Sequence, residues 1–157
     1  MTKNFSLSDR ARKTRTGSAG WMIQRLSSGL NDKMKARLAE RALTLDQFGI
    51  LMTLAEVDGL TQTEIGARVG FPGYTVTRAL DTLSAQGLVE RRPDAQSRRS
   101  HRVVMTAAGR ARMQGLFDIV ERMNADFLAP LAEADRRQFL ALLTRLVEAD
   151  QDVKSPR

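Results

Sequence analysis

The sequence predicts a mainly α-helical protein that carries one small β-hairpin, and two observations lead to this fold class. Through most of the 157 residues, apolar side chains recur three and four positions apart, which is the spacing of one helix face. One segment departs from this helical spacing: His101, Val103 and Met105 alternate with Arg102 and Val104, which is the period of a strand. Helices are therefore expected on both sides of a short hairpin.

The N-terminal third predicts an arm and two helices. Residues 1–16 are polar and basic, and we interpret them as a flexible arm that either stays in solvent or contacts a DNA backbone. A helix is expected over residues 17–39, where Met22, Leu26, Leu30, Met34 and Leu38 are spaced by four. The run from Thr44 to Val57 is apolar on more than one face, which predicts a helix buried among others.

A short helix is expected after the Asp58-Gly59 turn. Thr61 and Glu64 have the spacing of a capping box, in which each side chain satisfies a free backbone N–H of the other residue. Leu60 and Ile65 have the spacing of a hydrophobic staple around the same helix start. The helix is expected to end near Val69, because Gly70 and Pro72 follow.

A second helix is expected at once, from about Pro72 to Gln86. Proline suits a first turn, and Gly87 suits the position after a helix where φ becomes positive. Two helices joined by a tight turn that contains glycine are typical of a helix-turn-helix. The inner face of the second helix is apolar, at Val76, Ala79, Leu80 and Leu83.

The hairpin is expected to have strands at residues 88–92 and 101–106, joined by a loop over 93–100 that is rich in turn formers and arginine. We interpret His101 as a packed strand residue, on the same face as Val103 and Met105. Thr106 is then expected to cap a long helix.

Two long helices are expected to complete the chain, the first ending near Pro130 and the second covering residues 133–150, with a frayed tail at 151–157. A helix-turn-helix with a hairpin is complete without their apolar stripes, which therefore need a partner surface. The stripes consist of Leu116, Ile119, Val120, Met123 and Phe127, then Phe139, Leu142, Leu143, Leu146 and Val147.

Composition narrows the possible functions. The chain has no cysteine and a single histidine, which excludes disulfides and thiol chemistry and disfavours a multi-histidine metal site. It also lacks the P-loop, GxGxxG, HExxH and GxSxG motifs, so we expect no enzyme, no cofactor and no metal. No apolar run approaches the roughly 20 residues of a membrane helix, and no secretory signal is present, so we expect a cytoplasmic protein.

Charge points to double-stranded DNA as the partner. The net charge is +7, which favours a polyanion, and ten of the 25 Lys and Arg residues precede Ala42. The outer face of the second short helix has the size and chemistry for a major groove, and Arg78 can pair with guanine. Arg98 and Arg99 of the hairpin loop can enter a minor groove or contact phosphates. The predicted DNA-binding residues are Gly73, Tyr74, Thr75, Thr77, Arg78, Arg98 and Arg99.

The helix face, the hairpin tip and the aromatic and methionine side chains also have simpler interpretations. The helix face and the hairpin tip are also what a solvated surface looks like, and the same basic module can dock an acidic protein partner instead of DNA. Aromatic and methionine side chains at five positions either line a small-molecule pocket or are plain core. These positions are Trp21, Met22, Phe48, Met52 and Phe117.

From Leu60 to Gly109 the sequence resembles the winged-helix regulators of the MarR family. The matching stretches are LTQTEIGARVGFPGYTVTRALDTLSAQGLVERR and PDAQSRRSHRVVMTAAG. The combination of TVTR, an arginine-bearing wing and TxxG is fairly specific. Ser97 departs from the family pattern, which usually has aspartate there, and Phe71-Pro72-Gly73 stands where a capping serine is common.

The resemblance implies a winged helix-turn-helix DNA-binding lobe at residues 44–109, within one domain over 17–150. It further implies a homodimer formed by helices of residues 17–39 and 110–150, and a pseudo-palindromic operator. Family members are mostly repressors that a small phenolic or aromatic ligand releases from DNA. Carried over by position, the reading residues are Thr75, Thr77 and Arg78, and the wing arginine is Arg99.

Overall fold

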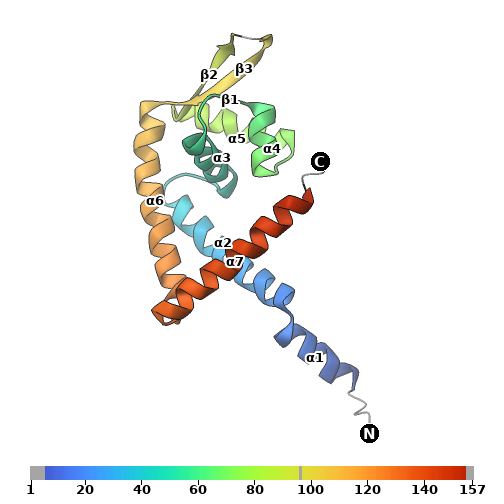
Figure 1. Ribbon diagram of the computed structural model, residues 1–157. Helices are drawn as coiled ribbons and strands as arrows, with labels where there is room; N and C mark the ends of the chain where they lie inside the picture. The colour runs from blue at the N-terminus through green and yellow to red at the C-terminus, as the bar shows by residue number, and fades with distance from the viewer. Residues whose placement is uncertain (1–5, 96, 155–157) are drawn as a thin grey trace. The chain divides into compact units, whose positions relative to one another are not determined.

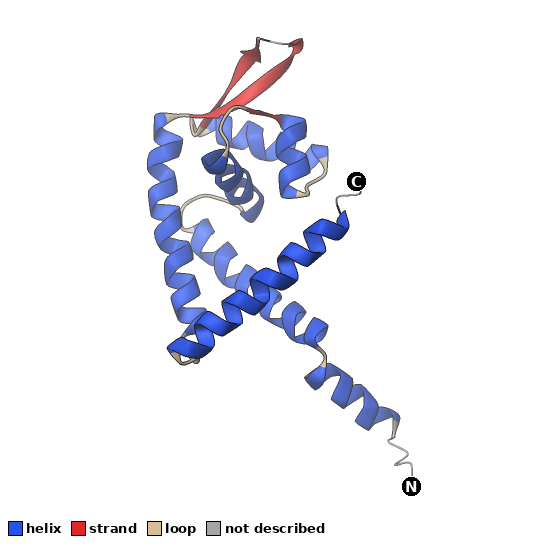
Figure 2. Ribbon diagram, in the orientation of Figure 1, coloured by secondary structure: helices blue, strands red, loops and turns tan. Residues whose placement is uncertain are grey.

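The computed structural model describes residues 6–95 and 97–154, with residues 98, 99 and 151–154 described by their backbone alone. Within these residues, helices predominate and one three-stranded antiparallel sheet is present, which confirms the predicted fold class (Figures 1 and 2). The chain divides into two compact units, Met1–Gly115 and Leu116–Arg157. No helix in the described part is both long and apolar enough to cross a membrane.

The first unit begins with α1 (Leu7–Gly17) and α2 (Ala19–Ala39). The sequence suggested a flexible arm over residues 1–16, but residues from Leu7 onward are helical, while 1–5 lie outside the described residues. The helix start is capped, because the Ser6 hydroxyl accepts a hydrogen bond from the backbone N–H of Asp9 at 3.2 Å. Because α1 buries no residue, it has no apolar stripe from which periodicity could have revealed it.

Helix α3 (Leu45–Glu56) lies at the centre of the first unit. Its start is a capping box, in which the Gln47 N–H donates to the Thr44 hydroxyl at 3.3 Å and the Thr44 N–H donates to the Gln47 side chain at 2.9 Å. Ile50, Leu51 and Leu54 are almost completely buried, which confirms the predicted core helix.

Helices α4 (Gln62–Val69) and α5 (Gly73–Ala85) form the predicted helix-turn-helix and pack against each other and against α3. The predicted capping box is present: the Glu64 N–H donates to the Thr61 hydroxyl at 3.3 Å, and the Thr61 N–H donates to the Glu64 carboxylate at 2.7 Å. After α5, Gly87 has φ +70°, a backbone conformation that favours glycine, as predicted.

The sheet consists of β1 (Leu60–Thr61), β2 (Val89–Asp94) and β3 (Ser97–Met105) in the order β1-β3-β2. The hairpin is confirmed, but the loop expected over residues 93–100 is much shorter, because Pro93 pairs with His101 inside the ladder. Proline is tolerated there because β2 is an edge strand and the ladder is irregular between Pro93 and Asp94. The two-residue strand β1, which pairs Leu60 with Val103, was not predicted.

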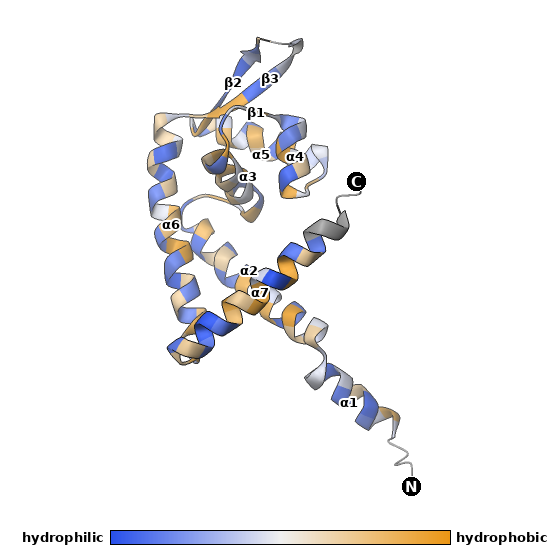
Figure 3. Ribbon diagram, in the orientation of Figure 1, coloured by the Kyte–Doolittle hydropathy of each residue, from blue (hydrophilic) through white to orange (hydrophobic). Residues whose placement is uncertain are grey.

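The expectation that His101 is packed is wrong, since its side chain is exposed. Val103 and Met105, on the same face of β3, are 1% and 4% exposed because helices cover the sheet there. The hairpin extends past that cover, so the same face meets solvent two residues earlier. Figure 3 shows hydrophobic colour at the base of the hairpin giving way to hydrophilic colour toward its tip.

Helix α6 (Ala107–Leu128) begins in the first unit and continues in the second, which also holds α7 (Glu133–Lys154). Thr106 caps α6 as predicted, accepting a hydrogen bond from the Gly109 N–H at 3.0 Å. In the second unit the rings of Phe127 and Phe139 lie 6.3 Å apart at 60°. The backbone of residues 151–154, expected as a frayed tail, continues α7.

Candidate nucleic-acid interface

Helix α5 presents one buried and one solvent-facing side. Val76, Leu80 and Leu83 are 0% exposed and fix the helix against the core. On the opposite side Tyr74 is 73% exposed, and Arg78 is also exposed. This arrangement holds the backbone of α5 rigidly while leaving its polar side chains available to a partner.

Tyr74, Thr75 and Arg78 line a hollow of about 420 Å³ between α5 and the start of α3. Within the described residues, the Arg78 guanidinium makes no hydrogen bond or ion pair, so all of its donors can reach a ligand. Asp46 of α3 lines the same hollow and places a carboxylate there. The charge available for an anion on this helix is therefore carried by Arg78.

The Thr77 hydroxyl is occupied inside the protein. It donates to the Gly73 carbonyl at 2.9 Å and accepts from the side-chain amide of Gln62 on α4 at 2.6 Å. The bond from Gln62 fastens α4 to α5, the bond to Gly73 lies within α5, and together they leave the methyl group of Thr77 as the part best placed for a base contact. Of the three predicted reading residues, Arg78 retains the greatest freedom to donate hydrogen bonds.

The N-terminus of α5 is open. Pro72 occupies the cap position, where no side chain bonds to the first-turn N–H groups, and a methyl group added at Gly73 would have nothing within 4 Å. Uncapped amides at a helix start attract anions through their dipoles. The backbone N–H groups of Gly73 and Tyr74 are thus available to a phosphate. A serine at the cap position, which is common in the family, would compete with a phosphate for the N–H groups of the first turn.

Two arginines of the wing, Arg91 and Arg102, attach it to the rest of the lobe. Arg91 of β2 pairs with Asp81 of α5 at 2.7 Å. Arg102 of β3 pairs with Asp94 at 3.2 Å and donates to the Gly59 carbonyl at 2.9 Å. The Asp94 side chain is only 7% exposed, so it supplies a buried carboxylate to the wing although Ser97 carries none.

The base of the wing is closed by contacts that sequence reasoning missed. One oxygen of the Asp58 side chain accepts from the Met105 N–H at 2.9 Å, and the other lies 3.4 Å from Arg110 of α6. Arg110 also donates to the Met105 carbonyl at 2.7 Å. Met105 and Arg110 are 47 and 52 positions from Asp58 in the sequence, so no local pattern signals these contacts.

The TxxG element has a structural cause. Thr106 donates its hydroxyl to the Gly87 carbonyl at 2.7 Å, and its own N–H donates to the Leu88 carbonyl at 3.1 Å. A side chain at Gly109 would meet the Leu88 carbonyl oxygen at 2.1 Å, so only glycine allows α6 to approach this closely. The motif therefore fixes where α6 leaves the wing.

Arg98 and Arg99, the predicted wing contacts, have backbone positions in β3, but their side chains lie outside the described residues. Their roles stay predictions.

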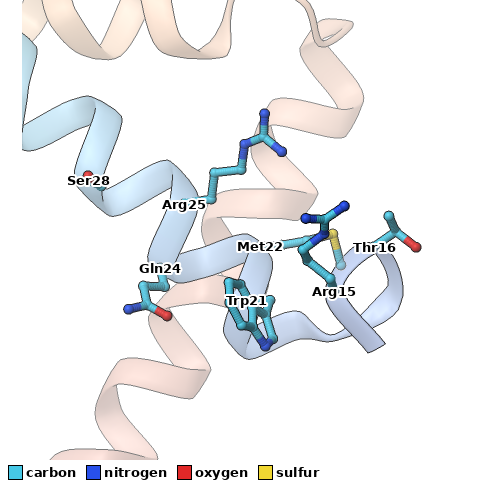
Figure 4. A pocket seen from close by; sticks show the side chains of 7 residues that line it. All are labelled: Arg15, Thr16, Trp21, Met22, Gln24, Arg25 and Ser28. Carbon is cyan, nitrogen blue, oxygen red and sulfur yellow. The ribbon is translucent and has the colours of Figure 1, made fainter. Parts of the chain in front are cut away.

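The five residues predicted to line a ligand pocket are not all brought together. Trp21 and Met22 line a hollow of about 660 Å³ between the end of α1 and the start of α2 (Figure 4). Phe48 and Met52 are half-buried on α3 and are not among its lining residues, and Phe117 belongs to the second unit. Figure 4 shows two arginines that the sequence analysis did not select, Arg15 and Arg25.

No group of three or more metal-binding side chains occurs among the described residues. Comparison with known proteins instead supports the DNA-binding interpretation. The model of the MarR family matches residues 43–100. The HTH-type transcriptional repressor YetL of Bacillus subtilis is 33% identical over 129 residues, which cover 78% of this chain and 75% of that protein.

Solved structures also resemble the chain. The Mycobacterium tuberculosis MarR family protein Rv2887, in complex with salicylic acid, is 28% identical with a TM-score of 0.70, covering 83% of this chain and 96% of that one. A MarR transcriptional regulator from Methanosarcina mazei Go1 has a TM-score of 0.79 at 23% identity, over 85% of this chain and 96% of that one. The second likeness concerns the fold, and it confirms the winged helix.

Proposed function

The chain belongs to the MarR family of transcriptional regulators, as its resemblance predicted, and we propose that it is a repressor that binds a pseudo-palindromic operator as a homodimer. The observation that carries this proposal is the solvent-facing side of α5, where Arg78 has no partner within the described residues. A single helix with its side chains fits the major groove, which is about 12 Å wide. Arg78 then lies where it can donate two hydrogen bonds to a guanine.

Exposed apolar stripes support the homodimer. On α2, Trp21, Met22 and Ile23 are 52%, 46% and 50% exposed in the single chain. On α7, Leu142 and Leu146 are 48% and 62% exposed. Large apolar side chains exposed on a helix are typical of an interaction surface, and the helices at residues 17–39 and 110–150 are those proposed to meet a second copy.

Selection of bound duplexes from a random pool tests the proposal. A two-fold dimer predicts two half-sites about 10–10.5 bp apart, centre to centre. On the selected duplex, Arg78→Ala should weaken binding by roughly 1–3 kcal/mol and relax the base preference at one position of each half-site. Lys35→Ala removes the same charge from an exposed position on α2 and should leave base preference intact.

A result in which Arg78→Ala keeps full affinity and preference on the selected duplex would remove Arg78 from the reading role. The rival function, docking of an acidic protein by the basic wing, predicts that no sequence is enriched and that unrelated duplexes compete equally well. For the wing, Arg99→Ala should lower affinity and reduce the slope of its salt dependence by about one unit.

We also propose that a small aromatic acid binds the hollow between α1 and α2 and releases the protein from DNA. Arg15 and Arg25 make no hydrogen bond or ion pair within the described residues, so both can pair with a carboxylate beside the Trp21 ring. Calorimetric titration with salicylate should show saturable binding that Arg25→Ala weakens and Arg37→Ala, on the same helix outside the hollow, does not. Absence of saturable heat would contradict the proposal.

A further inference from the structure

A second polar hollow, of about 300 Å³, lies between the start of α4 and the wing. Gln62 and Thr63 line it from the α4 side, and Arg91, Ser100 and His101 line it from β2 and β3. Its lining thus combines a permanent cation, a titratable imidazole, hydroxyl groups and an amide. Those are the groups that contact phosphate oxygens in protein–DNA complexes.

Both walls of this hollow are tied to α5. The Gln62 side chain donates to Thr77 on the exposed face of α5 at 2.6 Å, and the Arg91 guanidinium pairs with Asp81 of α5 at 2.7 Å. The hollow therefore lies between α4 and the hairpin, and a residue of each wall is bonded to a residue of α5. In a helix-turn-helix the first helix crosses the DNA backbone while the second lies in the major groove, so the sugar-phosphate backbone of a bound duplex is expected near the α4 side of the hollow.

The imidazole of His101 is exposed and makes no hydrogen bond within the described residues. Among the side chains that the structure describes, few charged groups surround it. Arg91 shares its hollow and is paired with Asp81, while Arg102, the next residue along β3, is paired with Asp94. The residue opposite His101 in the ladder is Pro93, which carries no charge.

On α4 the charged residue beside this hollow is Glu64. Hydrogen bonds from the backbone and the side chain of Thr61 hold the pKa of its carboxyl below the usual range. Its carboxylate therefore keeps its negative charge near neutral pH. His101 is the only histidine in the chain, and histidine is the residue type that proteins use as a proton switch near physiological pH.

We propose that this hollow binds one backbone phosphate of the duplex and that His101 makes this contact dependent on protonation. The inference rests on the proposed function. Neutral imidazole offers one N–H donor, whereas the protonated ring offers two and a positive charge. Affinity for DNA therefore rises when the imidazole gains a proton in more acidic solution, and the protein senses pH through a contact outside its base-reading helix.

The test measures the affinity of the full-length protein for the selected duplex by fluorescence anisotropy, from pH 5.8 to 7.6 at constant ionic strength. Wild-type affinity should fall about threefold to tenfold over this range, the size expected for one charge-assisted contact. His101→Gln should be flat at the wild-type value of high pH, and His101→Arg should be flat near the value of low pH. Because the side chain is exposed, neither variant is expected to disturb folding.

Neutral methylphosphonate linkages locate the phosphate. Placed one at a time along a half-site, they should abolish the pH dependence of wild-type binding at one position, where His101→Gln should lose less affinity than wild type. The inference is overturned if wild-type binding is independent of pH, if His101→Gln retains the pH dependence, or if no linkage affects it. Failure to enrich any duplex would instead overturn the proposed function, so the two failures are distinguishable.

Discussion

The lobe from α3 to β3 and the pair of helices α1 and α2 differ in how much of their stability one chain supplies. In the lobe, apolar side chains of every helix and strand are buried, and polar contacts such as Asp58 with Met105 close the structure over long sequence distances. Helix α1 buries nothing, and α2 buries only Leu38 among its described residues. The lobe is complete in a single chain, whereas the apolar surface of α2 needs a partner.

The largest effect expected from this difference comes from core truncation. Leu80→Ala removes a side chain that is 0% exposed in the lobe and should lower the free energy of unfolding by about 2–5 kcal/mol. Leu26→Ala, on α2 with 45% exposure, should leave the lobe intact and weaken self-association. Urea unfolding measures the loss of stability in both variants, and sedimentation measures their self-association. Equal losses of unfolding free energy in the two variants at low protein concentration would contradict the prediction.

Glycine substitutions should have opposite signs in the two regions. Gly109→Ala places a methyl group 2.1 Å from the Leu88 carbonyl oxygen and should destabilise the lobe by about 1–3 kcal/mol. Gly29→Ala on α2 meets nothing within 4 Å and should stabilise the helix by roughly 0.5–1 kcal/mol. Thermal unfolding of the two variants measures the sign of each stability change. Destabilisation by Gly29→Ala would contradict the prediction and indicate that another surface approaches α2 at that point.

Helix caps should differ in the same way. Thr61→Ala removes a hydroxyl that accepts a hydrogen bond from the Glu64 N–H, and the expected loss is about 1 kcal/mol. Ser18 occupies the cap position of α2 without a side-chain cap hydrogen bond, so Ser18→Ala should cost much less. Chemical denaturation compares the two, and equal losses would contradict the described capping.

The smallest expected effect is a pH dependence confined to the start of α4. The pKa of Glu64 is lowered in the folded state, so its stabilising contribution is present above the pKa of the unfolded state and is lost as pH falls through the folded value. The difference in unfolding free energy between wild type and Glu64→Gln should therefore shrink as the solution is acidified. In the Thr61→Ala background the difference should be only partly reduced, because the hydroxyl hydrogen bond is lost while the larger cause, the hydrogen bond from the backbone N–H of residue 61, remains.

Local signals in the sequence predicted much of the lobe. The capping box of Thr61 and Glu64 and the positive φ at Gly87 each depend on a few neighbouring residues, so spacing alone revealed them. The same reasoning selected the exposed face of α5 as a candidate reading surface. It did not predict that the Thr77 hydroxyl forms hydrogen bonds with Gln62 and Gly73 inside the protein. The roles of these residues toward DNA stay predictions.

What sequence reasoning missed depends on distant or weak signals. Strand β1 is two residues long and exists through its pairing with β3, far along the chain. The helix α1 lacks an apolar stripe. His101 continues the alternation of the buried residues Val103 and Met105, but at His101 the hairpin already extends beyond the helices that cover the sheet. The hollow with Arg15 and Arg25 requires the turn between α1 and α2, which no periodicity predicted.

The central claim, that reading is built into one lobe while binding needs two copies, is tested most directly by the mass of the complex with the selected duplex. Native mass spectrometry across a protein titration should show two chains on each duplex, with the one-chain complex scarcely populated, and a duplex with one half-site destroyed should bind far more weakly. A stable complex of one chain per duplex, equally tight on the intact and the half-destroyed sequence, would contradict the account.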